Sequence, residues 1–346
     1  MFEILRVLFN MVLRFGLMKS LILVIVLSNI FVFLLFLVDK HRAITGKWRI
    51  SERVLVFFTL CCGIGASVAM WVLKHKTKKP KFKIAAAVGI ILALIPIAHI
   101  AHGLTLGRVI RFVEVPKYFA KWPQALDGYR IAFMADIHMI PHEDMRGVIE
   151  ELNDRNIDLL LLGGDFSTRD NHYLGSLAEI ANLVTTDGIF GVEGNHDDYV
   201  RLFGAMESFG MLPLDNSGLY VREGFFVAGV SDKWNRQPCI NTATSRAGEN
   251  SFVLLVSHNP DVTESQSTEG IDLILSGHTH GGQITFFGYP FYLHRGSITN
   301  YGTNFAHGLM YTRDGAAMYV TSGVGMYYNV PRMFTRPEVV IFTMRN

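Results

Sequence analysis

The feature that most constrains the fold is the run SLILVIVLSNIFVFLLFLV, residues 20–38, which contains no charged side chain. A helix of about 20 residues crosses the roughly 30 Å hydrocarbon layer of a bilayer, so this run predicts a membrane helix. Residues 54–73 and 84–102 are similarly long and apolar, and membrane helices tolerate a proline such as Pro96. We therefore expect an α-helical membrane module over residues 1–102 with about three transmembrane helices.

The first 18 residues differ from these runs because Arg6 and Arg14 interrupt them. We interpret them as an amphipathic helix in the membrane interface, with a fourth span as the alternative. No small-residue cleavage site follows Val38, so we expect no cleaved signal peptide. With three spans, the cluster Lys74–Lys83 shares the cytoplasmic side with the basic N-terminus, which places the soluble half outside the cytoplasm. A fourth span would remove that preference.

The net charge of +2 hides two unlike halves. Residues 1–117 contain 17 Lys and Arg against 4 Asp and Glu, whereas residues 118–346 contain 15 against 26. Anionic lipid headgroups are the expected counterions of the basic half. The acidic soluble half argues against a nucleic acid partner. The three cysteines, Cys61, Cys62 and Cys239, have no zinc-type spacing.

The soluble half begins after a linker that we expect over residues 103–128, where Pro and aromatic residues gather. Residues 129–346 then form one domain of sufficient size for its own core. Apolar runs such as LLLLGGD alternate with helix-like segments, which predicts an α/β fold with buried sheets. Five expected strands finish in a carboxylate, amide or imidazole. These residues are Asp136, His138, Asp165, Asn195, His196, His258, His278 and His280.

The spacing of these residues indicates metal binding. Positions i and i+2 of an extended segment face the same way. The side chains of Asp136 and His138 can therefore point toward one position in space, and those of His278 and His280 can do the same. Asp165 ends a run apolar enough to be buried, where a carboxylate needs a partner or a metal; an Asx-turn is the alternative. Two carboxylates, one amide and four imidazoles exceed what one ion uses. They suit two manganese, iron or zinc ions.

The ordered motifs DIH, GGD, GNHD, SHNP and SGHTHGG resemble the calcineurin-like metallophosphoesterases, from Tyr129 to Thr343. The late run VTSGVGMYYNVPRMFTRPEV resembles their membrane-associated bacterial branch. The resemblance implies a double β-sheet sandwich flanked by helices and two metals. It implies that Asp136, His138 and His280 bind one metal, that Asn195, His258 and His278 bind the second, that Asp165 bridges them, and that His196 is a non-ligand catalytic residue.

A second resemblance covers Asp39 to Lys83, which is similar to a small bacterial membrane-protein family of unknown function. It implies a fused membrane module and no chemistry. The spans and this module together predict a multi-pass protein of the bacterial cell membrane.

Together these features predict a membrane-anchored di-metal phosphoesterase, of phosphodiesterase or pyrophosphatase type, with manganese as the expected metal. A metal-bridged hydroxide would attack phosphorus while His196 protonates the leaving oxygen or stabilises charge. Asp197 either orients His196 or caps the next helix. The glycines beside His278 and His280 would leave room for a phosphoryl group. We expect a phosphorylated, amphiphilic, lipid-linked or envelope substrate, and the sequence leaves the oligomeric state open. The alternative is a non-catalytic membrane scaffold or sensor with structural metals.

Overall fold

The computed structural model describes residues 17–138, 140–167, 173–290, 299–300, 302–327 and 330–346. The chain divides into two compact units, Met1–Leu104 and Thr105–Asn346, which we call the helical unit and the α/β unit. Residues 1–16, and with them almost all of the expected interfacial helix, lie outside the described residues.

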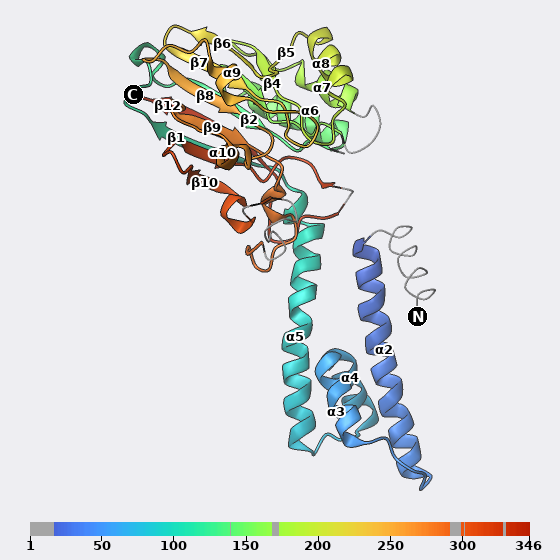
Figure 1. The fold of residues 1–346 in the computed structure, drawn as a ribbon. Helices are drawn as coiled ribbons and strands as arrows, with labels where there is room; N and C mark the ends of the chain where they lie inside the picture. The colour runs from blue at the N-terminus through green and yellow to red at the C-terminus, as the bar shows by residue number, and fades with distance from the viewer. Residues whose placement is uncertain (1–16, 139, 168–172, 291–298, 301, 328–329) are drawn as a thin grey trace. The chain divides into compact units, whose positions relative to one another are not determined.

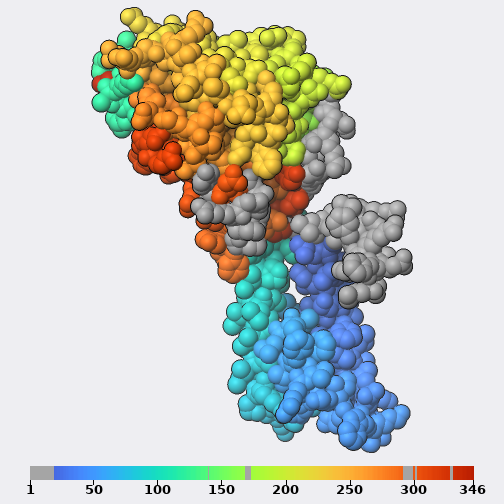
Figure 2. Space-filling view, in the orientation of Figure 1, coloured from blue at the N-terminus to red at the C-terminus, as the bar shows by residue number. Residues whose placement is uncertain are grey.

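The described part of the helical unit forms four helices: α2 (Leu17–Ile44), α3 (Glu52–Cys61), α4 (Gly63–Leu73) and α5 (Pro80–Leu104). By length and composition, α2 and α5 are suited to crossing a membrane. The sequence predicted a continuous membrane helix over residues 54–73. The structure corrects this prediction, because the helix breaks at Cys62. The two short helices that result lie between α2 and α5 (Figures 1 and 2).

The break at Cys62 coincides with the closest helix packing in the helical unit. A Cβ on Gly63 would overlap the backbone of Gly89 on α5, and a Cβ on Gly65 would overlap the backbone of Asn29 on α2. The Asn29 side chain accepts a hydrogen bond of 2.7 Å from the Gly65 N–H, which satisfies a first-turn donor of α4. Glycine at these crossings lets the backbones of α4 and its neighbours α2 and α5 approach closely.

Both ends of the α3–α4 hairpin return to the same end of the helical unit. His75, just after α4, lies 2.8 Å from the buried Asp39 carboxylate near the end of α2. Lys76 forms an ion pair of 2.8 Å with Glu52 at the start of α3. Arg49, in the α2–α3 connection, also pairs with Asp39. The hairpin therefore enters the helical unit and turns back without crossing it.

The α/β unit contains two six-stranded sheets, with strand orders β1-β12-β2-β3-β4-β5 and β10-β11-β9-β8-β7-β6 (Figure 1). The first sheet consists of β1 (Arg111–Tyr118), β2 (Arg130–Met134), β3 (Leu159–Leu162), β4 (Ile189–Gly191), β5 (Leu212–Pro213) and β12 (Glu338–Arg345). The second consists of β6 (Ser217–Arg222), β7 (Phe225–Gly229), β8 (Phe252–Val256), β9 (Leu273–Ser276), β10 (Gly308–Tyr311) and β11 (Ala317–Val320).

Helices cover the outer faces of this two-sheet sandwich. The helices are α6 (His142–Asn153), α7 (Tyr173–Ile180) and α8 (Tyr199–Ser208) on the first sheet, and α9 (Ile240–Thr244) and α10 (Val262–Ser265) on the second. On β2, Ile131 and Phe133 face the core between the sheets, while Ala132 and Met134 face the helices. Burial on both faces explains why such strands are apolar throughout, as the sequence predicted. The expected α/β sandwich is confirmed.

The expected linker over residues 103–128 is corrected by the structure, because it contributes β1. This strand pairs in parallel with β12 along its whole length, so β12 lies between β1 and β2. From Val113 to Tyr118 its residues alternate between partly buried and exposed, which is typical of a half-exposed strand. Pro116 is tolerated because β1 is at the edge of the sheet.

Candidate metal centre

The polar residues that follow five strands meet at one edge of the sandwich. Strands β2, β3 and β4 are mutually parallel, as are β7, β8 and β9, so their carboxyl ends gather there. Asp136 and His138 follow β2, Asp165 follows β3, Asn195 and His196 follow β4, His258 follows β8, and His278 and His280 follow β9. The structure thus brings together all eight residues that the sequence singled out.

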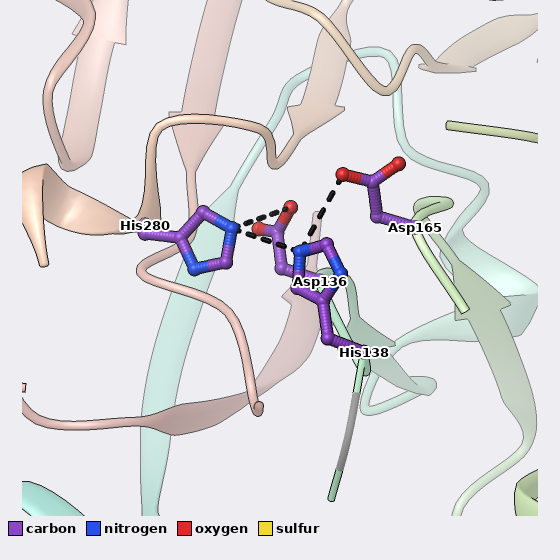
Figure 3. A group of neighbouring side chains, drawn as sticks. All are labelled: Asp136, His138, Asp165 and His280. Atoms are coloured by element: carbon purple, nitrogen blue, oxygen red, sulfur yellow. Dashed lines mark hydrogen bonds and ion pairs between the residues drawn. The ribbon is translucent and has the colours of Figure 1, made fainter. Parts of the chain in front are cut away.

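A first group of four buried residues places its ligand atoms within 4.8 Å of one another. The group consists of Asp136, His138, Asp165 and His280 (Figure 3). The Nε2 atoms of His138 and His280 are 3.0 Å apart, and His280 Nε2 lies 3.7 Å from Asp136 Oδ1. Imidazole and carboxylate atoms that converge in this way can hold a divalent cation.

A second group consists of Asp165, His258 and His278, and its ligand atoms also lie within 4.8 Å of one another. His258 Nε2 is 3.2 Å from His278 Nδ1 and 3.1 Å from Asn195 Oδ1. His258 Nδ1 donates to the backbone carbonyl of Gly163 at 2.8 Å. This bond leaves the Nε2 lone pair of neutral His258 directed into the group, an arrangement typical of metal-binding histidines.

Asp165 belongs to both groups, and its two oxygens have different partners. Oδ2 lies 3.5 Å from His138 Nε2 and 3.4 Å from His258 Nε2, so one oxygen faces both groups. Oδ1 accepts a hydrogen bond of 2.9 Å from the backbone N–H of His196. The geometry is that required of a carboxylate that bridges two cations.

The backbone around the two groups is strained. Five of the residues, Asp136, His138, Asp165, His278 and His280, have φ between 43° and 72°. Non-glycine residues rarely adopt this left-handed region, and such strain clusters at functional sites where the surrounding structure enforces it. The donor set therefore fits two divalent cations through oxygen and nitrogen atoms held in a preformed arrangement.

Burial shifts the titration of the first group. Burial raises the pKa of Asp136 to about 7, and it lowers the pKa of His138 to about 4. Burial together with the nearby His138 ring holds the pKa of His280 well below its usual value. Burial also opposes ionisation of Asp165, but the charge of His258 and its hydrogen bond outweigh it and depress the pKa of this carboxyl. Without metal, the charge of the His258 imidazole thus compensates Asp165, a role that bound cations would take over.

Asp197 fulfils neither of its two predicted roles. Its carboxylate accepts four backbone hydrogen bonds of 2.8–3.3 Å. The donors are the N–H groups of Asp165, Phe166, Ser167 and Gly194. The cap of α8 is instead Asp198, which accepts from the Arg201 N–H. Asp197 therefore links the loop that contains Asp165 to the loop after β4. This role depends on the folded geometry and could not be predicted from the sequence.

The glycines near the centre serve close packing of the chain. A Cβ on Gly194 would overlap the Asp165 carboxylate. A Cβ on Gly282 would lie 2.5 Å from Pro290, and one on Gly281 would lie 3.0 Å from Thr335. Gly281 and Gly282 have φ of 58° and 82°, respectively, and pack against protein. The expectation that they leave space for a phosphoryl group is thereby corrected.

A cavity of about 270 Å³ opens over the two groups. It is lined by Asp165, Asn195, His196, Trp234, His278, His280 and Tyr327. The His196 ring lies 5.7 Å from His138 and 5.1 Å from Tyr327, measured between centroids. The sequence did not single out Trp234, which lies outside the quoted motifs, or Tyr327, because the resemblance of the late run assigned no role to its individual residues.

Arg332 is a further residue that the sequence did not indicate. Its buried guanidinium donates to the backbone carbonyl of His280 at 3.1 Å and to that of Gly325. Arg332 thereby links the loop of His280, a candidate ligand, to the loop that contains Tyr327.

A double-sheet sandwich with two overlapping Asp/His groups at its strand ends is the arrangement that the resemblance to the calcineurin-like metallophosphoesterases implied. The family model of the calcineurin-like phosphoesterases matches residues 129–282. A phosphodiesterase of Escherichia coli, YaeI, is 32% identical over 235 residues, which cover 62% of this chain and 82% of that protein. The chain belongs to the calcineurin-like phosphoesterase family.

Other relatives agree with this assignment. An uncharacterized metallophosphoesterase of Helicobacter pylori is 28% identical over 66% of this chain, which spans only 62% of that relative's length. The metallophosphoesterase YkuE of Bacillus subtilis is 29% identical over 65% of this chain and 82% of its own length. A second family model, described as a protein of unknown function (DUF1294), matches residues 29–82 and confirms the resemblance of the helical unit.

Proposed function

We propose that this chain is a membrane-anchored phosphoesterase that hydrolyses a phosphoester or pyrophosphate bond with two divalent cations, manganese foremost. The observation that carries the proposal is the single Asp165 oxygen that faces both groups of ligand atoms. Asp136, His138 and His280 would complete one cation site, and Asn195, His258 and His278 the other. Two cations so held supply Lewis acidity toward phosphoryl oxygens and lower the pKa of a bound water.

His196 is the proposed catalytic residue that is not a metal ligand. Its backbone N–H fixes Asp165, while its ring lines the cavity beside Tyr327. From there the imidazole can protonate the leaving oxygen or stabilise the charge that develops on it. General acid catalysis of this kind typically contributes about 10²–10⁴-fold.

The proposed substrate is a phosphorylated amphiphile, such as a lipid-linked or cell-envelope phosphoester. The apolar helices α2 and α5 support this class, because they would keep the centre close to a bilayer. The rings of Trp234 and Tyr327 in the cavity wall support it as well, because they offer apolar surface next to the ligand atoms.

The helical unit supports an orientation with the α/β unit outside the cytoplasm. Because the α3–α4 hairpin turns back, α2 and α5 are the proposed crossings and residues 39–53 and 74–83 share one end. These two segments contain eleven Lys and Arg against Asp39 and Glu52. Positive charge near helix ends favours the cytoplasm, so the opposite ends of α2 and α5 face outward.

The function is tested with the purified full chain in detergent, stripped of metal and resupplied with Mn²⁺. We expect manganese-dependent hydrolysis of bis(p-nitrophenyl) phosphate, abolished by Asp165→Asn and by His280→Ala. Two bound ions per chain without turnover of this or any other phosphoester would support the scaffold alternative and overturn the proposal. Lipid profiles recorded before and after addition of active enzyme then identify the substrate class.

Orientation is tested with reporters fused after Asn346, so that the whole chain is retained. We expect alkaline phosphatase activity at this position and no fluorescence from a reporter that matures only in the cytoplasm. The opposite pattern would overturn the outward orientation while leaving the phosphoesterase proposal intact.

A further inference from the structure

Close to the metal centre the α/β unit exposes a tight aromatic turn, ITFFGYP, residues 284–290. The backbones of Phe286 and Tyr289 exchange hydrogen bonds of 2.8 and 3.0 Å, with Phe287 and Gly288 at the tip. Phe286, Phe287 and Tyr289 are 50%, 54% and 61% exposed. Three neighbouring aromatic side chains thus face solvent within one turn.

The tip of this aromatic turn is locally unfavourable. Phe287 has φ of 49° and precedes Gly288 at 93°, positions where turns prefer Asn, Asp or Gly. Phe334, whose ring lies 4.8 Å from that of Phe287, also has a positive φ of 56°. A bulky residue in this region is strained, and Phe286 and Phe287 nevertheless stay about half exposed. Exposed aromatic residues in a strained turn point to an external partner.

The aromatic turn is tied to the first residues of the α/β unit. Arg336, two residues after Phe334, donates to the Val109 carbonyl at 3.3 Å, and the Arg111 N–H donates to the Pro337 carbonyl at 3.0 Å. Val109 is itself about half exposed. Because Thr105 directly follows the last residue of α5, the chain reaches this face of the α/β unit within a few residues of a proposed membrane helix.

The aromatic turn is also tied to the metal centre. The side-chain amide of Gln283, three residues after His280, donates to the Val330 carbonyl at 2.8 Å. The backbone carbonyl of Gln283 accepts from the Met333 N–H at 2.9 Å. The Thr285 N–H in turn donates to the Met333 carbonyl at 2.9 Å. The turn, the ligand loop and the loop of Tyr327 therefore form one hydrogen-bonded assembly.

We propose that the aromatic turn inserts into the headgroup region of the lipid bilayer and thereby holds the metal centre against the membrane surface. This rests on the membrane anchoring in the proposed function and assigns the substrate to phosphoesters within the bilayer. Aromatic side chains favour the membrane interface, where a ring can be buried while polar groups stay hydrated. We choose the bilayer as the occupant because Val109 and Arg111, which contact residues near this turn, follow the proposed membrane helix α5 by only a few residues.

The test places a tryptophan in the turn and measures its contact with lipid. Full-length Phe287→Trp protein is reconstituted into phosphatidylcholine nanodiscs, one copy in each, with ordinary or dibrominated acyl chains. The matched control is Tyr118→Trp, because Tyr118 is aromatic and 72% exposed. It lies at the far end of β1, roughly 23 Å from Arg111 at the usual rise of a strand. Subtracting the wild-type spectrum isolates the emission of each added tryptophan.

We expect blue-shifted emission from position 287, quenched at least about twofold by brominated lipid, and unquenched, red-shifted emission from position 118. Adding Phe286→Ser to Phe287→Trp should weaken the quenching. Emission at 287 that brominated lipid leaves unchanged overturns the proposal, whether the tryptophan lies in water or against protein. Turnover of bis(p-nitrophenyl) phosphate by the Tyr118→Trp nanodiscs reports separately on the proposed function. Quenching at position 287 without any turnover would support the bilayer contact and contradict the phosphoesterase proposal.

Discussion

Both units of this protein bury carboxylates, but they surround them with different partners. In the helical unit, Asp39 is contacted by Arg49, His75 and Lys76, so the chain supplies the compensating cations. In the α/β unit, Asp136 and Asp165 face imidazole nitrogens that converge on the same space. The first arrangement is electrostatically complete and fixes loops together. The second directs several nitrogen and oxygen atoms at one space that added cations can occupy, which distinguishes a binding site from a structural ion pair.

The largest effect is expected from Asp165→Asn, which removes the charge shared by both groups. Asparagine keeps an oxygen for the His196 N–H, so the fold should persist. We expect turnover to fall by about 10⁴-fold, equivalent to about 5.5 kcal/mol, and bound metal to fall below two ions per chain. Elemental analysis and phosphodiester hydrolysis check this. Full metal content with full turnover would contradict the role of this residue.

The same substitution in the other unit, Asp39→Asn, should give the opposite signature. It leaves the cationic groups of Arg49 and Lys76 without their buried counter-charge, which typically costs about 3–5 kcal/mol. We expect a lower unfolding temperature of the helical unit in detergent, with metal content and turnover retained. Loss of bound metal in this variant would erase the distinction between the two kinds of carboxylate.

His196→Ala separates metal binding from proton transfer. The hydrogen bond to Asp165 comes from the backbone, so it survives loss of the ring. We expect two bound ions and a fall in turnover on the order of 10²-fold, or about 3 kcal/mol. Unchanged turnover at unchanged metal content would rule out a catalytic imidazole at this position.

Glu338 tests whether the role of a buried carboxylate depends on the side chains that contact it or on the unit in which it lies. It lies in the α/β unit, yet its partners are His307 at 2.9 Å and Arg111 at 2.6 Å. Burial opposes its ionisation, but these partners hold its pKa at about 2, against a usual 4.5. Because the folded pKa is lowered, this stabilisation is complete above pH 4.5 and disappears as the pH falls toward 2.

Glu338→Gln should therefore cost about 2–3 kcal/mol of stability near neutral pH and change little at pH 2. Chemical unfolding followed across this pH range provides the measurement, with metal content as the control. Equal losses at both pH values would show that charge is not what Glu338 contributes.

The metal centre was predictable because its polar and charged side chains directly follow buried, apolar strands. A carboxylate such as Asp165 at the end of a buried strand needs compensation, and parallel strands bring such ends together whatever the loop lengths. The α/β class followed from the same apolar runs. All eight residues at the strand ends could therefore be named from the sequence.

The corrected features depend on partners distant in the chain. The break at Cys62 lies next to a close backbone contact between Gly63 and Gly89, which hydropathy does not encode. β1 became a strand through pairing with β12, more than 200 residues later. The four N–H bonds of Asp197 require two loops in their final conformations. Local composition carries none of this information.

The position of β12 also governs how this protein is made. The last strand along the chain lies between β1 and β2, two of the earliest, so the first sheet cannot close until residues 338–345 have been synthesised. Asp136 follows β2, and its loop bonds to residues 324 and 325, close to that late strand. During synthesis α2 and α5 can enter a bilayer while the α/β unit is still unfolded and able to be translocated. The metal centre would then assemble only after the whole chain has been synthesised.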